Sequence, residues 1–136
     1  MINHQLFLGL GSNLGDRAEN IRKAVLLIQE RVGEVVRQSS LIETEPWGFE
    51  SDHCFLNGVI LCETTLTPRQ VLRATQKIER ELGRKSKTTS SYADRPIDID
   101  ILLYDDLTVN EPDLKIPHPL MHERDFVMIP LNEIRY

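Results

Sequence analysis

The sequence has few features that would mark a secreted or membrane-embedded protein. Its longest uninterrupted apolar run, residues 24–28, is five residues long, far short of the roughly 20 residues that cross a bilayer. The chain has two cysteines, Cys54 and Cys62, whose spacing fits neither a CxxC redox pair nor a zinc knuckle. We therefore expect free thiols, buried or half-buried, in a protein of the reducing cytoplasm.

Signals for export and for multidomain organisation are also missing. The chain begins Met1-Ile2-Asn3-His4 and continues directly into strand-like residues, so no signal peptide is expected. No repeat, low-complexity tract or Pro/Ser-rich linker interrupts the sequence. With 136 residues, of which 40% are hydrophobic, the chain is predicted to form a single globular domain over residues 1–136.

The sequence has an excess of negative over positive charge. The 16 Lys and Arg residues are outnumbered by 21 Asp and Glu residues, which gives a net charge of −5. Affinity for a nucleic-acid backbone comes mainly from basic side chains that neutralise phosphates, so this balance argues against general nucleic-acid binding. The cations are unevenly distributed, however, because residues 84–95 hold four of them against one acidic residue.

Hydrophobic periodicity and turn residues predict the main elements. Alternating or β-branched residues predict strands over residues 6–10, 35–44, 55–64 and 97–104. Apolar residues at helical spacing predict helices that begin after Asp16 and Thr67 and end at Gly33 and Gly83. The order β-α-β-β-α-β predicts an α+β, ferredoxin-like sandwich, with both helices packed on one face of an antiparallel sheet. One more short helix is expected in the C-terminal part.

A glycine-rich stretch, Gly9 to Gly15, begins near the end of the first predicted strand. Its spacing, GxGxxxG, does not match the dinucleotide-binding fingerprint, and no GK followed by Ser or Thr marks a P-loop. We interpret the stretch as a turn from strand to helix, in which Asn13 tolerates unusual backbone angles.

Asp98 and Asp100 are a candidate metal site. Their spacing of two on a strand places both carboxylates on one face, with backbones about 7 Å apart. Two hard oxygen donors at this separation can hold one or two Mg²⁺ ions, which keep several waters and also bind substrate phosphates. The alternative interpretation is a solvated polar face of an edge strand.

The cationic stretch 84–95 leads directly into this strand. Cationic side chains beside a metal-binding carboxylate pair suit phosphoryl transfer, in which metal and cations stabilise developing charge. A flexible, solvated loop is the alternative. On the second predicted helix, Leu72, Gln76 and Glu79 form a row that faces either this loop and a ligand or plain solvent.

Two further clusters suit a flat heterocycle and a nucleotide. Trp47 lies in a Pro/Gly loop, and Phe55 and Asn57 follow on one strand face. Rings stack on a heterocycle and an amide both donates and accepts, although a hydrophobic plug over the core would have a similar composition. In the C-terminal part, His118 between two prolines and the nearby Arg124 favour phosphate or nucleotide contact over metal binding.

Three segments together resemble one enzyme family: FLGLGSNLGDR, DRPIDIDILLY and PHPLMHERDFVMIPL. Over about residues 6–133 the chain is similar to the 6-hydroxymethyl-7,8-dihydropterin pyrophosphokinases. The resemblance implies the ferredoxin-like fold and Mg²⁺-dependent transfer of pyrophosphate from ATP to the pterin hydroxymethyl group, with release of AMP, in tetrahydrofolate biosynthesis. We expect a cytoplasmic monomer whose partners are ATP and the pterin, and which binds neither nucleic acid nor membranes.

The same resemblance implies roles for individual residues. Asp98 and Asp100 match the ligands of two Mg²⁺ ions, and Arg84 and Arg95 match arginines that assist transfer. Contacts to ATP are implied for Gln76, Glu79, Lys87, Tyr92, Ile101, His118 and Arg124. A pterin pocket is implied for Thr44, Pro46, Trp47, Gly48, Phe55, Asn57 and Phe126.

The sequence departs from the family pattern at a few positions. Tyr92-Ala93-Asp94 stands where members often have Trp-Gly-Pro, which keeps an aromatic ring and adds a negative charge beside Arg95. Ser86, Ser91 and Asp113 stand where some relatives have arginines. These positions lie among the expected phosphate contacts.

Two other classes of protein share the predicted topology. A ferredoxin-like regulatory module would bind a small ligand without chemistry and would need no DxD motif beside a cationic loop. An RNA-binding sandwich would need exposed aromatic residues on a basic sheet face. Strands rich in Val, Ile and Leu and the net charge of −5 argue against the RNA-binding class.

Overall fold

A computed structural model describes residues 3–44, 54–83 and 96–135. Its elements are β1 (His4–Ser12), α1 (Arg17–Arg31), β2 (Glu34–Gln38), β3 (Ile42–Thr44), β4 (Phe55–Thr64), α2 (Pro68–Glu81), β5 (Asp98–Tyr104), β6 (Val109–Glu111), β7 (Leu114–Ile116), a 3-10 turn (Met121–Glu123) and α3 (Asp125–Ile134). The main sheet is antiparallel with strand order β2-β4-β1-β5, and β3 also pairs with β4. Among the described residues, no helix is both long enough and apolar enough to span a membrane.

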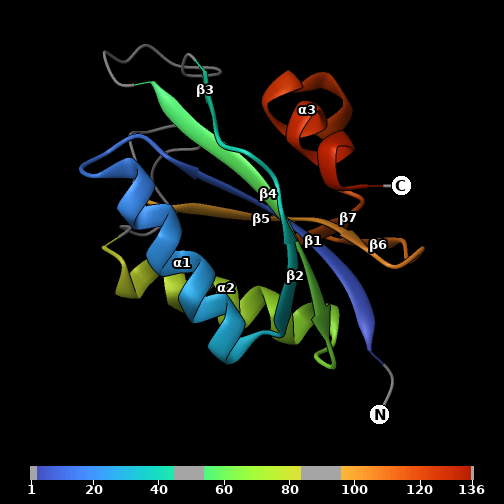
Figure 1. Cartoon of the computed structure of the whole chain (residues 1–136). Helices are drawn as coiled ribbons and strands as arrows, with labels where there is room; N and C mark the ends of the chain where they lie inside the picture. The colour runs from blue at the N-terminus through green and yellow to red at the C-terminus, as the bar shows by residue number, and fades with distance from the viewer. Residues whose placement is uncertain (1–2, 45–53, 84–95, 136) are drawn as a thin grey trace.

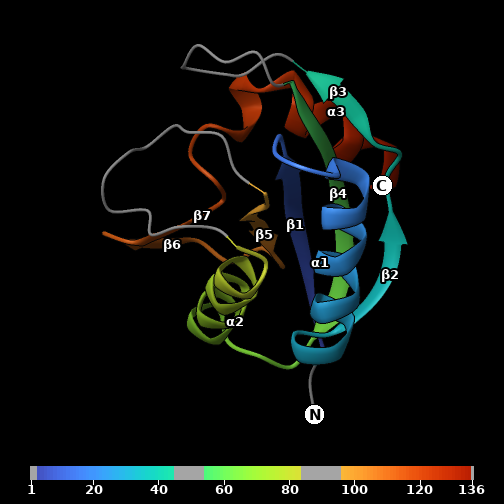
Figure 2. The ribbon, with the colours of Figure 1, turned by 90° about the vertical axis from the view of Figure 1, so that its left-hand side faces the viewer.

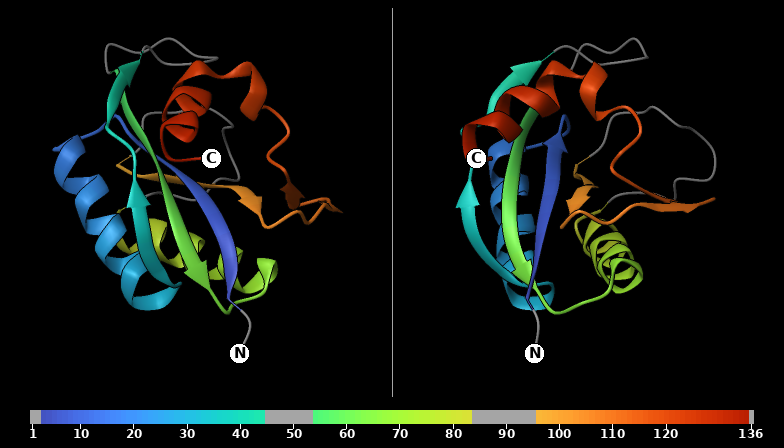
Figure 3. Two further views of the ribbon diagram at one scale, coloured as in Figure 1. Left: turned by 45° about the vertical axis from the view of Figure 1, so that its right-hand side comes forward. Right: turned by 90° about the vertical axis from the view of Figure 1, so that its right-hand side faces the viewer.

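The sheet lies between helices on both of its faces (Figures 1 and 2). The core beneath α1 and α2 includes Leu8, Ile28, Ile78 and Ile99. A second, smaller core beneath α3 includes Val59, Leu102, Val127 and Leu131. The ferredoxin-like sandwich, with two helices on one face, is therefore confirmed. The expected C-terminal helix is α3, which lies across β4 on the opposite face (Figure 3), so this part of the sheet is not open to RNA.

The starts of α1 and α2 follow the predicted local signals. The Asp16 side chain accepts a hydrogen bond from the Glu19 N–H at 3.2 Å. At α2, Thr67 and Gln70 form both bonds of a capping box, side chain to backbone in each direction. These bonds satisfy amides that the first helical turn leaves without partners. After α2, Gly83 adopts φ +100, the left-handed conformation that ends a helix most easily at glycine.

Two local predictions differ from the structure, one for a strand and one for a turn. Residues 35–44 were expected to form one strand, but they form β2 and β3 with a break at residues 39–41. Ser39 binds the backbone of Val59 through its N–H and its Oγ, and the N–H and Oγ of Ser40 both donate to the Glu133 carboxylate of α3. The hydrogen bond from the Ser40 hydroxyl, and after it the bond from the Ser40 N–H, hold the pKa of Glu133 below its usual value. Contacts to distant elements therefore override the local preference for one extended strand.

The glycine-rich stretch is the second difference. Gly9 and Gly11 lie inside β1, so the expected turn is confined to the residues after Ser12, where Gly15 has φ +69. Among the described residues other than glycine, only Asp105 has a positive φ. The expectation of unusual backbone angles at Asn13 is therefore wrong.

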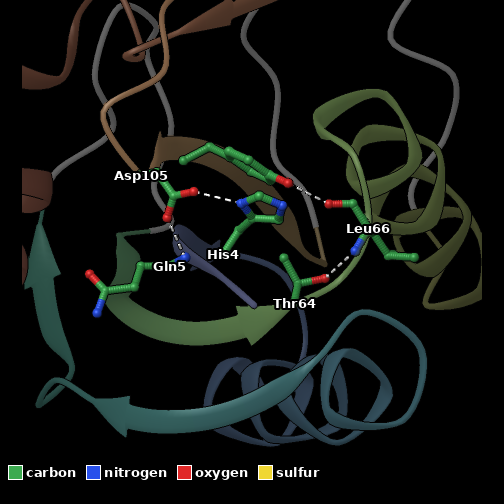
Figure 4. A network of polar contacts seen from close by, with 6 residues as sticks. His4, Gln5, Thr64, Leu66 and Asp105 are labelled. Carbon is green, nitrogen blue, oxygen red and sulfur yellow. Dashed lines mark hydrogen bonds and ion pairs between the residues drawn. The ribbon is translucent and has the colours of Figure 1, made fainter. Parts of the chain in front are cut away.

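A polar network fixes the end of the sheet where β1 begins (Figure 4). The Asp105 carboxylate accepts a hydrogen bond from the Gln5 N–H at 2.7 Å and contacts His4 Nδ1 at 2.6 Å. Leu66, in the connection from β4 to α2, accepts a bond from the Tyr104 hydroxyl and donates its N–H to Thr64 Oγ. The first residues of β1, the end of β5 and the start of the α2 connection are thereby joined.

The two cysteines are free thiols, as expected, with Cys54 half-buried and Cys62 buried. Burial raises the pKa of the Cys62 thiol to about 12. Because the thiolate is the reactive form, we expect Cys62 to resist Ellman's reagent in the folded protein at about pH 8. Titration should give one accessible thiol before denaturation and two after it. Two rapidly reacting thiols in the folded protein would contradict the buried position of Cys62.

Candidate active site

Asp98 and Asp100 lie on the face of the sheet that α3 partly covers. Their neighbours Ile99 and Ile101 pack into the core beneath α1 and α2, so alternation along β5 turns both carboxylates to the other face. Both aspartates are half-buried. The predicted placement of two carboxylates on one strand face is confirmed.

Two glycines of β1 separate these carboxylates from the middle of the sheet. Gly11 pairs with Asp98 and Gly9 pairs with Asp100 on one side of β1, and Gly11 pairs with Asn57 on the other. We call Gly9 and Gly11 the glycine strip. Because glycine has no side chain, only backbone lies between the carboxylates and β4 along this row. A Cβ added to Gly11 would lie 2.8 Å from Asn57 Oδ1, which is closer than such atoms normally approach.

Three of the residues predicted to bind the pterin meet beside Gly11. The buried Asn57 donates a hydrogen bond from Nδ2 to Thr44 Oγ at 2.8 Å. Thr44 pairs in turn with Phe55, whose ring lies 3.5 Å from the position of a Cβ on Gly11. The amide is therefore held in one orientation next to an aromatic ring, an arrangement that suits recognition of a flat polar heterocycle.

The C-terminal part adds a cation and a second ring. The His118 N–H donates to the Leu102 carbonyl at 3.0 Å, which attaches this segment to β5. The Arg124 guanidinium lies 5.6 Å from the ring centroid of Phe126, a cation–π contact at the start of α3. Phe126 packs against the core beneath α3. His118 therefore lies beside β5, and Arg124 and Phe126 lie on the α3 side of the sheet.

The two predicted ATP contacts on α2, Gln76 and Glu79, differ in how far they are buried. Gln76 is half-buried, but Glu79 is only 2% exposed, and its Oε2 accepts a hydrogen bond from the Ile99 N–H at 2.8 Å. The side chain of Ile101 is buried in the core, so its backbone is the part that a nucleotide can reach. The interpretation of Glu79 as ordinary helix surface is therefore wrong.

Arg17 is a residue that sequence reasoning left without a role. It donates from Nη1 to the Cys54 carbonyl at 2.9 Å and from Nη2 to the Glu43 carboxylate at 2.7 Å. Its two partners adjoin Thr44 and Phe55, so one side chain connects the end of β3 with the start of β4. Arg17 ends the segment FLGLGSNLGDR, but its distant partners become apparent only once the chain is folded.

Asp113, one of the departures from the family pattern, has a partner of its own. Arg69, near the start of α2, pairs with Asp113 at 2.7 Å and also with Glu111. The hydrogen bond from Arg69 lowers the pKa of Asp113 below its usual value. This acidic residue therefore joins the β6–β7 hairpin to α2.

Seven predicted site residues lie outside the described part of the chain, and they stay predictions: Arg84, Arg95, Lys87, Tyr92, Pro46, Trp47 and Gly48. Within residues 3–44, 54–83 and 96–135, no group of three or more His, Cys, Asp or Glu side chains could hold a metal ion. The pair Asp98 and Asp100 nevertheless fits Mg²⁺, which usually binds one or two carboxylates together with waters and substrate phosphates.

Comparison with known proteins gives consistent results. Residues 7–136 match the family model of 7,8-dihydro-6-hydroxymethylpterin-pyrophosphokinase (HPPK). The chain is 50% identical over 131 residues to 2-amino-4-hydroxy-6-hydroxymethyldihydropteridine pyrophosphokinase of Porphyromonas gingivalis, covering 95% of the chain and 89% of the relative. The enzyme of the same name from Bacillus subtilis is 40% identical over 134 residues, covering 98% of the chain and 79% of the relative.

The fold is also similar to that of solved structures. Plasmodium falciparum HPPK-DHPS superimposes with a TM-score of 0.76 at 17% identity, over 97% of the chain and 41% of the solved one. The chain thus spans about two fifths of the length of that protein.

Proposed function

The chain belongs to the 7,8-dihydro-6-hydroxymethylpterin-pyrophosphokinase family, and we propose that the face of the sheet around Asp98 and Asp100 is its active site. The enzyme transfers pyrophosphate from ATP to 6-hydroxymethyl-7,8-dihydropterin in folate biosynthesis. AMP is the nucleotide product, because the β- and γ-phosphoryl groups leave together. The row Asp98–Gly11–Asn57 supports this placement, since it sets carboxylates and a recognition amide side by side across bare backbone.

We propose that Asp98 and Asp100 are the ligands of two Mg²⁺ ions. Both side chains provide the hard oxygen donors that Mg²⁺ prefers, and they share one strand face. Mg²⁺ held by these residues would neutralise charge on the triphosphate and favour ionisation of the attacking hydroxyl. Through such ions, the two carboxylates would hold the triphosphate on the same face of the sheet as the proposed pterin site. No covalent intermediate with the protein is needed.

The pterin is proposed to bind on the β3–β4 side of the glycine strip. Asn57, oriented by Thr44, supplies a donor and an acceptor to the edge of the heterocycle, and Phe55 supplies a ring face. Phe126 is proposed to complete the stack from α3. Pro46, Trp47 and Gly48 are the remaining proposed contacts.

ATP is proposed to lie along β5, on the other side of the carboxylates. The proposed contacts are Gln76, Lys87, Tyr92, Ile101, His118 and Arg124, whereas the carboxylate of Glu79 is bonded to the Ile99 amide. Arg84 and Arg95 are proposed to stabilise the charge that develops on the transferred group. We further propose that residues 1–136 act as a single domain and as a monomer in the cytoplasm.

Consumption of ATP separates this enzyme from a ligand-binding module of the same topology. With Mg²⁺, ATP loss should require the hydroxymethyl pterin and should stop when EDTA removes the metal. Binding of the pterin without any consumption of ATP would favour the regulatory module and contradict the proposal.

Replacement of Arg17 by alanine should weaken pterin binding. The change removes two hydrogen bonds that hold the residues next to Thr44 and Phe55, so these two groups lose their fixed separation. Two charge-assisted bonds at a half-exposed site correspond to roughly a tenfold rise in KM for the pterin, with KM for ATP unchanged. Arg22→Ala, which removes only a surface contact to Glu19 within α1, is the matched control. Equal KM values for Arg17→Ala and Arg22→Ala would contradict this role.

A further inference from the structure

In the described part of the sheet, β5 pairs with another strand along only one of its two edges. Among these strands, β5 is at the edge of the sheet, bonded to β1 on one side. The amide of Ile99 points away from β1, and an unpaired amide in a buried position is costly. Glu79 supplies the acceptor, because its Oε2 lies 2.8 Å from the Ile99 nitrogen. Glu79 itself is only 2% exposed. A carboxylate from α2 thus takes the place that a neighbouring strand would have.

This bond lies between the two proposed metal ligands. The Ile99 N–H belongs to the peptide unit that follows Asp98, and Asp100 comes directly after Ile99. The orientation of that peptide plane determines how the Asp98 and Asp100 side chains leave the opposite face of the strand. Fixing the plane therefore fixes both carboxylates relative to each other.

The side chain that makes the bond is itself held firmly. Val71, Thr75 and Ile78 on the same helix are buried, with exposed fractions of 1% or less, so α2 cannot shift easily against the sheet. Glu79 is also almost fully enclosed, which leaves little of its surface for a nucleotide. Its position fits support of β5 better than contact with ATP.

We propose that Glu79 is a positioning residue, which holds the edge of β5 so that Asp98 and Asp100 share one geometry toward Mg²⁺ and the triphosphate. The proposal rests on the proposed active site and assigns Glu79 a role other than contact with ATP. What matters is the hydrogen-bond acceptor at the Ile99 amide, and the negative charge of Glu79 is secondary.

Three variants separate the acceptor from the charge. Glu79→Gln keeps an acceptor at the same reach without the charge, Glu79→Asp keeps the charge but is one methylene too short, and Glu79→Leu has neither. The measurements are hydrogen exchange of the Ile99 amide, binding of Mn²⁺ with α,β-methylene-ATP by calorimetry, and kcat as a function of Mg²⁺ concentration. The first of these needs no activity at all.

For Glu79→Leu and Glu79→Asp, we expect faster exchange at Ile99, about tenfold weaker Mn²⁺ binding, and a kcat lowered by about 50-fold, because small displacements of catalytic groups cost up to about 100-fold. KM for the pterin should stay within about twofold of the wild-type value. Glu79→Gln should restore all three measurements to within about fivefold.

A control variant distinguishes positioning from general destabilisation. Thr64 is 1% exposed and donates from Oγ to the Val32 carbonyl at 2.6 Å, at the far end of the sheet. Thr64→Val should lower the melting temperature but leave Mn²⁺ binding and the Mg²⁺ dependence of kcat unchanged.

Several outcomes would overturn the proposal. Wild-type behaviour of Glu79→Asp together with impaired Glu79→Gln would show that charge, not the acceptor, matters. A rise in KM for ATP with normal exchange at Ile99 would show direct contact with ATP. If Glu79→Leu does not fold, the Asp and Gln variants decide the question. Absence of AMP formation by the wild-type protein would refute the active site, whereas exchange at Ile99 tests the Glu79 bond independently.

Discussion

Replacement of Asp98 by asparagine should lower kcat by about a thousandfold while the protein stays folded. The amide has nearly the same size, so the packing of β5 is preserved, but it lacks the charge proposed to bind Mg²⁺. Metal-ion catalysis contributes several kcal/mol of transition-state stabilisation, and about 4 kcal/mol corresponds to a factor of 10³ in rate. Removal of one of two neighbouring negative charges also lessens their repulsion, so the melting temperature should not fall.

Asp106 provides the matched control for this experiment. It follows β5 closely but is exposed and lies outside the proposed site. Asp106→Asn should keep kcat and the melting temperature of the wild-type protein. Wild-type activity in Asp98→Asn, measured at saturating ATP and Mg²⁺, would exclude Asp98 as an essential metal ligand.

The second large effect is expected from a single methyl group at Gly11. In Gly11→Ala the new Cβ would lie 2.8 Å from Asn57 Oδ1, so the Asn57 side chain must move. That movement breaks or lengthens its hydrogen bond to Thr44 and turns the amide away from the proposed pterin site. A misplacement of this kind costs up to about 100-fold in kcat/KM for the pterin. The backbone itself is not strained, because the φ of Gly11 is not positive.

Gly9 tests whether any methyl group on the glycine strip would have the same effect. A Cβ on Gly9 would meet only the Leu102 side chain, at 3.5 Å, an ordinary van der Waals distance. Gly9→Ala should therefore stay within about threefold of the wild-type kcat/KM. Calorimetric titration with the pterin alone would confirm that Gly11→Ala acts on binding. Equal effects of the two substitutions would contradict the specific role of Asn57.

Features encoded by neighbouring residues could be predicted from the sequence. The capping box of Thr67 and Gln70 acts within one helical turn, so its residues alone determine where α2 begins. The strand predicted from alternation over residues 55–64 has the same bounds as β4. The shared face of Asp98 and Asp100 follows from the same period of two.

Features that depend on distant partners could not be predicted. The break after β2 is fixed by bonds from Ser39 and Ser40 to β4 and α3, which no local pattern reveals. The helical period places Glu79 in a row with Gln76, but only the packed sheet shows that its carboxylate reaches the amide of Ile99. The same limitation applies to Arg17, whose partners lie 26 and 37 positions away in the chain.

The resemblance to the family supplied what periodicity could not. Spacing alone left Asp98 and Asp100 open to interpretation as a solvated polar face. The structure places them beside the glycine strip, with Asn57 on its other side, and the family match gives the chain a reaction.

The identity of the nucleotide product tests the proposed reaction most directly. ATP carrying radioactive phosphate at the β-position would be incubated with enzyme, Mg²⁺ and hydroxymethyl pterin, and the products would be separated by chromatography. We predict unlabelled AMP in a one-to-one ratio with a pterin product that carries the label. ADP as the stoichiometric product, with label retained on the nucleotide, would contradict transfer of pyrophosphate.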